Sequence, residues 1–166
     1  MDNIKFYEIS NNYIDFLASY APHLFHNKKS EQENERKFIG IVIKVNGMDY
    51  FAPLSSFKQK DKNMKEGLGF IKVKDYAVIN LNNMFPVPES EYTYVDFSLI
   101  NDLKYKSLLL MEYRFIKSIQ DKIRKNAAVL YKHKIENGNS TPLSKICNDF
   151  VLLEAKCKEY KANSCS

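Results

Sequence analysis

The sequence is poor in the residues and segments that mark several protein classes. It has five Gly, five Pro, three Cys and no Trp among its 166 residues. So little Gly and Pro excludes a collagen-like or low-complexity chain. No apolar run reaches the ~20 residues of a membrane-spanning helix, and the opening MDNIKFYEIS lacks the basic and apolar regions of a secretory signal. We therefore expect one cytoplasmic domain over residues 1–166, without a membrane partner.

The signatures of several enzyme classes are also missing. The sequence contains no GxxxxGK[ST], GxGxxG, HExxH, CxxC or GxSxG. Cys147, Cys157 and Cys165 are too few and too widely spaced for a disulfide framework, which favours a reducing compartment. His23 and His26 form an HxxH pair, but zinc would need two more ligands. We expect no metal and no cofactor, and prefer a surface helix end for the histidine pair over an acid–base role.

Positive charge is present and is concentrated in two stretches. The net charge is +5, and residues 104–134 carry nine Lys or Arg against two Asp or Glu. Residues 51–75 carry six against three, whereas residues 76–103 have four acids and no Lys or Arg. Cations interleaved with Tyr and Phe suit a phosphate backbone with unstacked bases. An ordinary solvated lysine face with a mobile loop is the alternative explanation.

The hydrophobic pattern predicts short strands followed by helices, which is an α+β layout. Asn46-Gly47 between two apolar runs predicts a tight hairpin, because both residues tolerate positive φ. The polar, Lys-rich stretch 54–67 is expected to be a loop, and two prolines in NNMFPVPES disfavour a regular ladder there. Strands are expected at 4–9, 37–45, 48–53, 69–73, 76–81 and 92–97, and helices at 13–20, across the basic stretch, and at 150–160. Ser10 or Asn11 is expected to cap the first helix, and Asp149 the last.

Apolar residues recur every seven positions in the basic stretch, which predicts one long amphipathic helix or two in sequence. A coiled coil is the alternative, but Glu112 and Asn126 interrupt its second core position, so we favour a helix packed on the sheet. A protein-binding adaptor would also have such a stripe, although a buried core explains it. The repeating residues are Leu109, Ile116, Ile123 and Leu130.

The segment FAPLSSFK, residues 51–58, combines hydroxyls with a cation. We expect a strand to end at Pro53, which would place Ser55, Ser56 and Lys58 at the mouth of a loop. A hydroxyl beside a fixed cation suits a phosphate whose charge grows in a transition state. A polar turn after a strand is the structural alternative.

Five blocks occur in a specific order along the chain: KFYEISNNYIDFL, FIGIV, YFAPLSSFK, INLNNMFPVPESE and CNDFVLLEAKCKEY. In this order they resemble the ToxN/AbiQ family, the protein toxins of type III toxin–antitoxin and phage-abortive-infection systems. The resemblance implies a metal-independent endoribonuclease on a twisted, partly barrel-like antiparallel sheet with helices, similar to the Kid/MazF toxins. It also implies inhibition by a small structured antitoxin RNA, which the toxin processes from a repeat precursor and holds in a closed toxin–RNA oligomer.

The resemblance assigns roles to five residues. The family's hydroxyl pair falls on Ser55 and Ser56, its lysine on Lys58, a basic residue on Arg36 and an aromatic on Tyr13. The first hydroxyl is often Thr in the family, and some relatives have Lys in place of Arg36. Because Arg hardly ever releases a proton, we expect Arg36 to stabilise charge rather than act as an acid.

The chemistry that follows is attack of an RNA 2′-hydroxyl on the neighbouring phosphate, which leaves a 2′,3′-cyclic phosphate and a 5′-hydroxyl. We expect Lys58 and Arg36 to stabilise the phosphorane, and Ser56, with Ser55 beside it, to hydrogen-bond an oxygen or relay a proton. Tyr13 would orient the substrate or stack on a base, with core packing as the alternative. The expected substrates are A-rich cellular or phage mRNAs.

The positive side chains outside this group are expected to follow the antitoxin backbone. They are Lys60, Lys62 and Lys65 in the loop, and Lys117 and Arg124 in the helical stretch. A non-catalytic RNA-binding module with the same basic surface is the alternative to an endoribonuclease.

Overall fold

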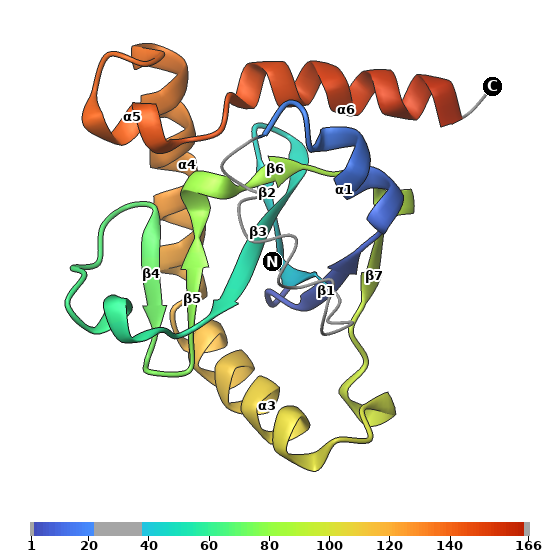
Figure 1. Ribbon diagram of the computed structural model, residues 1–166, viewed down its shortest axis with the longest axis vertical. Helices are drawn as coiled ribbons and strands as arrows, with labels where there is room; N and C mark the ends of the chain where they lie inside the picture. The colour runs from blue at the N-terminus through green and yellow to red at the C-terminus, as the bar shows by residue number, and fades with distance from the viewer. Residues whose placement is uncertain (1, 22–37, 165–166) are drawn as a thin grey trace.

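The computed structural model describes residues 2–21 and 38–164. Within them, antiparallel strands occupy most of the first half and long helices the second, so the predicted α+β class is confirmed (Figure 1). The strands are β1 (Phe6–Ile9), β2 (Ile39–Val45), β3 (Met48–Ser56), β4 (Phe70–Val73), β5 (Ala77–Asn80), β6 (Phe85–Pro86) and β7 (Tyr92–Tyr94). The helices are α1 (Asn11–Leu17), α3 (Leu103–Ser118), α4 (Gln120–Asn137), α5 (Pro142–Ile146) and α6 (Phe150–Ser164). Short 3-10 turns are η1 (Gln59–Lys62), η2 (Leu81–Asn83), η3 (Glu89–Glu91) and η4 (Phe97–Leu99).

The strands form one antiparallel sheet in the order β4-β5-β3-β2-β1-β7, and β6 pairs with β3 beside this path. Its end strands, β4 and β7, have only four and three residues and do not pair with each other. Closing a barrel requires continuous pairing around the whole ring. Among the described strands the sheet is therefore not closed, which corrects the expectation of a barrel-like sheet.

The β2–β3 hairpin has the predicted turn. Asn46 and Gly47 have φ of 52° and 73°, and the flanking pair is Val45 with Met48. Two consecutive positive φ values match the twist of the strands that they connect. The sequence predicted that this strand ends at Pro53. In the structure, β3 continues to Ser56.

The extra length of β3 comes from a change of partner. Pro53 is the last residue paired with β2, opposite Gly40, and the next residue, Leu54, pairs with Ile79 of β5. Proline donates no backbone hydrogen bond, so a switch between two neighbours at this position costs little. As a result, one strand carries buried core residues first and exposed serines at its end.

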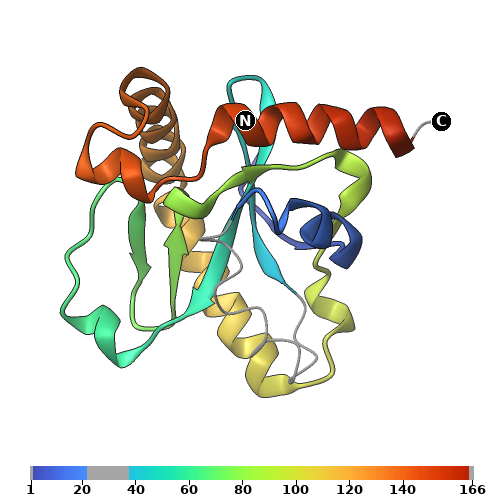
Figure 2. The same cartoon turned by 45° about the horizontal axis from the view of Figure 1, so that its top comes forward.

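The main core lies between the sheet and the helix pair α3–α4, which runs along one side of it (Figures 1 and 2). The two helices are separated at Ile119, whose φ of −118° and ψ of 16° are not helical. The predicted stripe is buried against strand residues such as Ile41 and Val73, so packing on the sheet is confirmed over a coiled coil. The buried stripe residues are Leu109, Ile116, Ile123 and Leu130.

A second apolar cluster joins α1, β6 and α6, which crosses beside them (Figure 2). Leu17, Phe85 and Leu153 are fully buried in it. Both predicted helix caps are confirmed: Ser10 accepts the Tyr13 N–H at 3.2 Å, and Asp149 accepts the Leu152 N–H at 3.2 Å. These caps fix where the two helices begin on this side of the sheet.

Three local features differ from the sequence predictions. β7 ends at Tyr94 instead of residue 97, because the Asp96 carboxylate accepts the Ser98 N–H and starts η4. Residues 85–86 pair with β3 although Pro86 has no backbone N–H to donate, and this pairing is only two residues long. The break expected near residue 140 contains the short helix α5, in which Thr141 and Ser144 cap each other.

Candidate active site

Ser55, Ser56 and Lys58 lie where β3 ends and a turn begins. Ser55 and Ser56 pair with Val78 and Ala77 of β5, and all three candidate side chains are exposed. The backbone stays extended through Lys58, with φ of −112° and ψ of 162°. Because successive strand residues point to opposite faces, Ser56 and Lys58 share one face and Ser55 lies on the other. From this alternation we expect Ser56 and Lys58 to face the same way, with Ser55 facing away from them.

The backbone of Lys58 is held by the turn that follows it. Its N–H donates to Oδ2 of Asp61 at 2.7 Å, and its carbonyl accepts the Asp61 N–H at 2.9 Å. Asp61 is only 3% exposed, although its neighbours Lys60 and Lys62 are exposed. This stretch was predicted to be a loop without regular structure. Instead a buried carboxylate closes η1 across residues 59–62.

The other predicted loop cations point outward. Lys60, Lys62 and Lys65 are exposed, and no described carboxylate lies within 4.0 Å of their ammonium groups. Cations left without an internal partner are free to neutralise phosphate and release its counterions. The loop therefore presents a group of available positive charges next to Ser56 and Lys58.

Glu66 fixes the far end of the same loop. Its carboxylate accepts the Lys72 N–H of β4 at 2.8 Å and the Lys122 ammonium of α4 at 3.0 Å. Burial pushes the pKa of Glu66 upward, but these two bonds outweigh burial and hold the pKa below its ordinary value. The Lys72 ammonium also donates to the carbonyl of Lys62 at 3.3 Å. The basic loop is thus attached to the protein at both ends.

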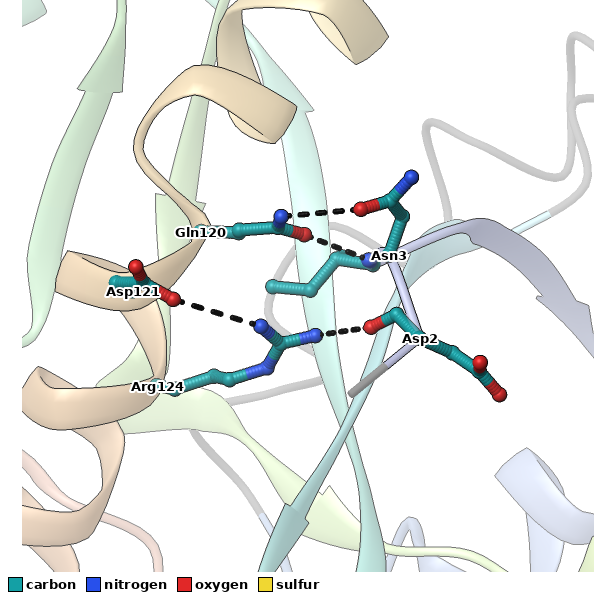
Figure 3. A network of polar contacts seen from close by, with 6 residues as sticks. Asp2, Asn3, Gln120, Asp121 and Arg124 are labelled. Carbon is teal, nitrogen blue, oxygen red and sulfur yellow. Dashed lines mark hydrogen bonds and ion pairs between the residues drawn. The ribbon is translucent and has the colours of Figure 1, made fainter.

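Lys117 and Arg124, the predicted helical contacts, have different surroundings. Lys117 is exposed near the end of α3. Arg124 of α4 is engaged within the protein: its guanidinium donates to the carbonyl of Asp2 and lies 3.7 Å from the Asp121 carboxylate (Figure 3). Its side chain retains 23% exposure. Of the pair, Lys117 has the freer charge.

Gln120 completes the attachment of the N-terminal segment to the start of α4 (Figure 3). Its Oε1 accepts the Ile4 N–H at 3.1 Å, and its amide nitrogen donates to Oδ1 of Asn3 at 3.1 Å. Residues more than 110 apart in the sequence are therefore joined at the α3–α4 junction.

Tyr13 is part of the second core. It has no exposed area, its hydroxyl donates to the Pro86 carbonyl at 2.6 Å, and its ring meets Tyr160 edge-on at 5.0 Å. Burial is the main cause that raises its pKa. The structure gives Tyr13 the packing role that was the alternative for it, and a direct contact between its ring and RNA stays a prediction.

Three predicted or considered residues, Arg36, His23 and His26, lie outside the described residues. Within the described residues, 2–21 and 38–164, no three His, Cys, Asp or Glu side chains gather in a way that could hold a metal ion. No helix in that part of the chain has the length and apolar character to cross a membrane. Cys147 and Cys157 are buried free thiols.

Sequence reasoning missed Asp61 and Glu66. A signal for Asp61 was available, because a carboxylate three residues after an extended residue has the spacing of a capped turn. The many lysines around it favoured a solvated loop instead. Glu66 had no such signal, since its partners Lys72 and Lys122 meet it only in the folded chain.

A family model described as the toxin ToxN of type III toxin–antitoxin systems matches residues 5–158. The endoribonuclease ToxN of Bacillus thuringiensis subsp. kurstaki is 34% identical over 96% of this chain and 86% of its own. The endoribonuclease AbiQ of Lactococcus lactis subsp. lactis is 31% identical over 97% of this chain and 91% of its own.

The fold agrees with these sequence matches. One similar solved structure belongs to a bacterial type III toxin–antitoxin system with selective toxin inhibition by a non-coding RNA pseudoknot. It is 32% identical, has a TM-score of 0.77, and covers 96% of this chain and 99% of its own. Sequence and architecture thus match over nearly the full length, including the strand end that carries the serines and the lysine. This chain belongs to the ToxN/AbiQ family of endoribonuclease toxins of type III toxin–antitoxin systems.

Proposed function

We propose that this endoribonuclease cleaves A-rich RNA at specific sequences and without a metal ion. The 2′-oxygen bonds to the adjacent phosphorus, the bond to the 5′-oxygen breaks, and a 2′,3′-cyclic phosphate and a 5′-hydroxyl remain. The observation that carries the proposal is that Ser56 and Lys58 are exposed at the end of one strand, two residues apart in the sequence and beside loop cations that have no carboxylate partner among the described residues.

The roles follow from where charge develops. Lys58, with Arg36, stabilises the negative charge that grows on the phosphate oxygens. Ser56 hydrogen-bonds a non-bridging oxygen or relays a proton. Ser55, the adjacent residue, faces the other way, and we assign it a smaller, supporting role in this step. Tyr13 orients the substrate; because its ring is buried, we assign this effect to its support of the fold around β6.

RNA binding is assigned to the positive side chains around this face and on the helices. Lys60, Lys62 and Lys65 follow the backbone near the cleaved bond, while Lys117 and Arg124 contact it further away. The positive charge on both surfaces makes binding strongly dependent on salt.

The antitoxin is proposed to be a small structured RNA that binds this chain directly, as a non-coding RNA pseudoknot inhibits the toxin of the similar solved structure. By the family resemblance, the toxin processes this RNA from a repeat precursor and forms a closed hetero-oligomer with it. The chain then acts as a single toxin domain in the cytoplasm, in growth arrest and phage defence. A likeness of its sheet to the Kid/MazF toxins stays a prediction.

The proposal is tested by incubating the purified chain with an end-labelled A-rich RNA in the presence of EDTA and mapping the ends of the products. We expect cleavage with cyclic-phosphate and 5′-hydroxyl ends. RNA that stays intact until a divalent metal is added would contradict the mechanism.

The site is tested in the same assay with Ser56→Ala and Lys58→Ala. We expect each to lower the cleavage rate about 100-fold, because each removes a group that acts on the transition state. Ser55→Ala is expected to lose less, since Ser55 lies on the other face. Lys145→Ala, an exposed lysine of α5, is the matched control. Full activity of both Ser56→Ala and Lys58→Ala would show that the site is elsewhere.

A further inference from the structure

We infer that Asp61 is a positioning residue, whose buried carboxylate holds the backbone of Lys58 so that its ammonium group reaches the scissile phosphate. The inference rests on the proposed function of Lys58. It concerns a residue that neither the sequence motif nor the family resemblance singled out.

Lys58 is the first residue beyond the ladder that supports the site. The pairing of β3 with β5 ends with Ser56 opposite Ala77, and the Phe57 N–H still donates to the Tyr76 carbonyl at 3.3 Å. The N–H of Lys58 has left the ladder, and its partner is Oδ2 of Asp61 at 2.7 Å. The sheet therefore places Ser56, whereas Asp61 places Lys58.

The two hydrogen bonds between these residues fix the backbone on both sides of the Lys58 Cα. The N–H of Lys58 is held by the carboxylate, and its carbonyl is held by the Asp61 N–H at 2.9 Å. Together they set φ and ψ, and so set the direction in which the long side chain leaves the strand. A misplacement of about 1 Å in a reacting group can lower a rate about 100-fold.

Asp61 does this without neutralising the lysine that it positions. Its carboxylate is 3% exposed and accepts a backbone N–H, which is a charge-assisted hydrogen bond of the stronger kind. Within the described residues it forms no ion pair with an ammonium group. The positive charge of Lys58 thus remains available to a phosphate.

The experiment measures single-site cleavage of an end-labelled A-rich RNA by the purified full chain and its variants. Asp61→Ala is expected to lower kcat about 10- to 100-fold with KM within about twofold, because positioning for the reaction is lost and the binding cations remain. Asp61→Asn keeps an oxygen acceptor for the Lys58 N–H and is expected to stay within about threefold of the parent kcat.

The double variant separates positioning from general support of the fold. If Asp61 acts through Lys58, Lys58→Ala with Asp61→Ala is expected to be no slower than Lys58→Ala alone. Asp102→Ala is the matched control: this aspartate also caps a turn of backbone, accepting the Lys104 and Tyr105 N–H groups, but on α3. It is expected to keep the parent kcat.

Three results would overturn the inference: parent kcat in Asp61→Ala, equal losses in Asp61→Asn and Asp61→Ala, or additive losses in the double variant. If Asp61→Ala does not fold, Asp61→Gln takes its place, since it has the same amide as Asp61→Asn but displaces the oxygen acceptor by one methylene group. Full activity of Lys58→Ala would instead overturn the proposed function, and so the two failures are distinguishable.

Discussion

At the scale of single residues, Glu112 is the carboxyl group least suited to its surroundings. It is 4% exposed on the buried face of α3, between Leu109 and Ile116, and has no hydrogen-bond partner among the described residues. Burial raises its pKa to about 7. The folded state therefore holds the proton more tightly than the unfolded state does.

This burial predicts a pH-dependent loss of stability. Below the unfolded pKa of about 4.5, Glu112 is neutral in both states, and its penalty grows as pH rises towards the folded pKa of about 7. Glu112→Gln, which is neutral throughout, is expected to match the parent near pH 4.5 and to exceed its free energy of unfolding by about 3 kcal/mol near pH 8. Urea denaturation across this pH range measures the difference.

The exposed Glu136 of α4 offers the control for that measurement, because among the described residues its ion pair is with the exposed ammonium group of Lys132 at 3.9 Å. Glu136→Gln is expected to follow the parent at every pH. A constant difference between Glu112→Gln and the parent at all pH values would contradict the assignment of the effect to ionisation.

The candidate residues themselves were within reach of the sequence, but their arrangement was not. FAPLSSFK pointed to Ser55, Ser56 and Lys58, since their chemistry is local to one segment. The separation of Ser55 from the other two depends on β3 continuing to Ser56, which requires β5 as a partner. Tyr13 had the spacing of either a core or a contact residue, and only tertiary packing shows its burial.

At the scale of elements, the α3–α4 junction is tied to the chain's second to fourth residues (Figure 3). Loss of one hydrogen bond of this kind changes a local equilibrium by up to about tenfold. Gln120→Ala is therefore expected to speed amide hydrogen exchange at Ile4 about tenfold, while exchange in the β2–β3 hairpin is unchanged. Exchange monitored by NMR measures both.

Asp121→Ala is the neighbouring control. The Asp121 carboxylate is fully exposed and lies 3.7 Å from Arg124, and exposed pairs of this kind contribute little. Amide hydrogen exchange at Ile4 in Asp121→Ala is expected to match that of the parent. Equal exchange in Gln120→Ala and the parent would mean that the segment is held by other contacts.

Elements with a strong local signal were predicted correctly, and those that depend on a distant partner were not. The hairpin at Asn46-Gly47 and the buried stripe of the two long helices followed from turn chemistry and periodicity. The helix α5 was missed because GNSTP is also typical of a loop, and its cap forms between Thr141 and Ser144. The open order of the sheet depends on long-range pairing, which the sequence pattern does not encode.

At the scale of the whole molecule, α6 joins the two apolar clusters. Phe150 belongs to the main core and Leu153 to the second one, and both are fully buried. Glu154 adds polar contacts, because it accepts the hydroxyls of Tyr50 at 2.5 Å and Tyr131 at 2.8 Å. The two cores are therefore expected to unfold together.

Phe150→Ala tests this coupling. Removal of a fully buried ring is expected to lower the free energy of unfolding by about 3–5 kcal/mol, with one cooperative transition for both cores. The adjacent Val151 is 61% exposed, and Val151→Ala is expected to stay within about 0.5 kcal/mol of the parent. Urea denaturation followed by circular dichroism and tyrosine fluorescence compares them. Two separate transitions would contradict the coupling.

The change of partner along β3 also bears on how such a toxin loses its activity under selection. Under the proposed assignment, Ser55 to Asp61 form one strand end and one turn, whereas the residues that hold the cores lie before and after them. Under the same proposal, one substitution such as Ser56→Ala is expected to lower cleavage strongly and to leave a folded protein with most of its exposed lysines. If the proposed function holds, surviving cells would carry full-length variants that keep the proposed RNA-binding surface and so still compete with active copies for the antitoxin RNA.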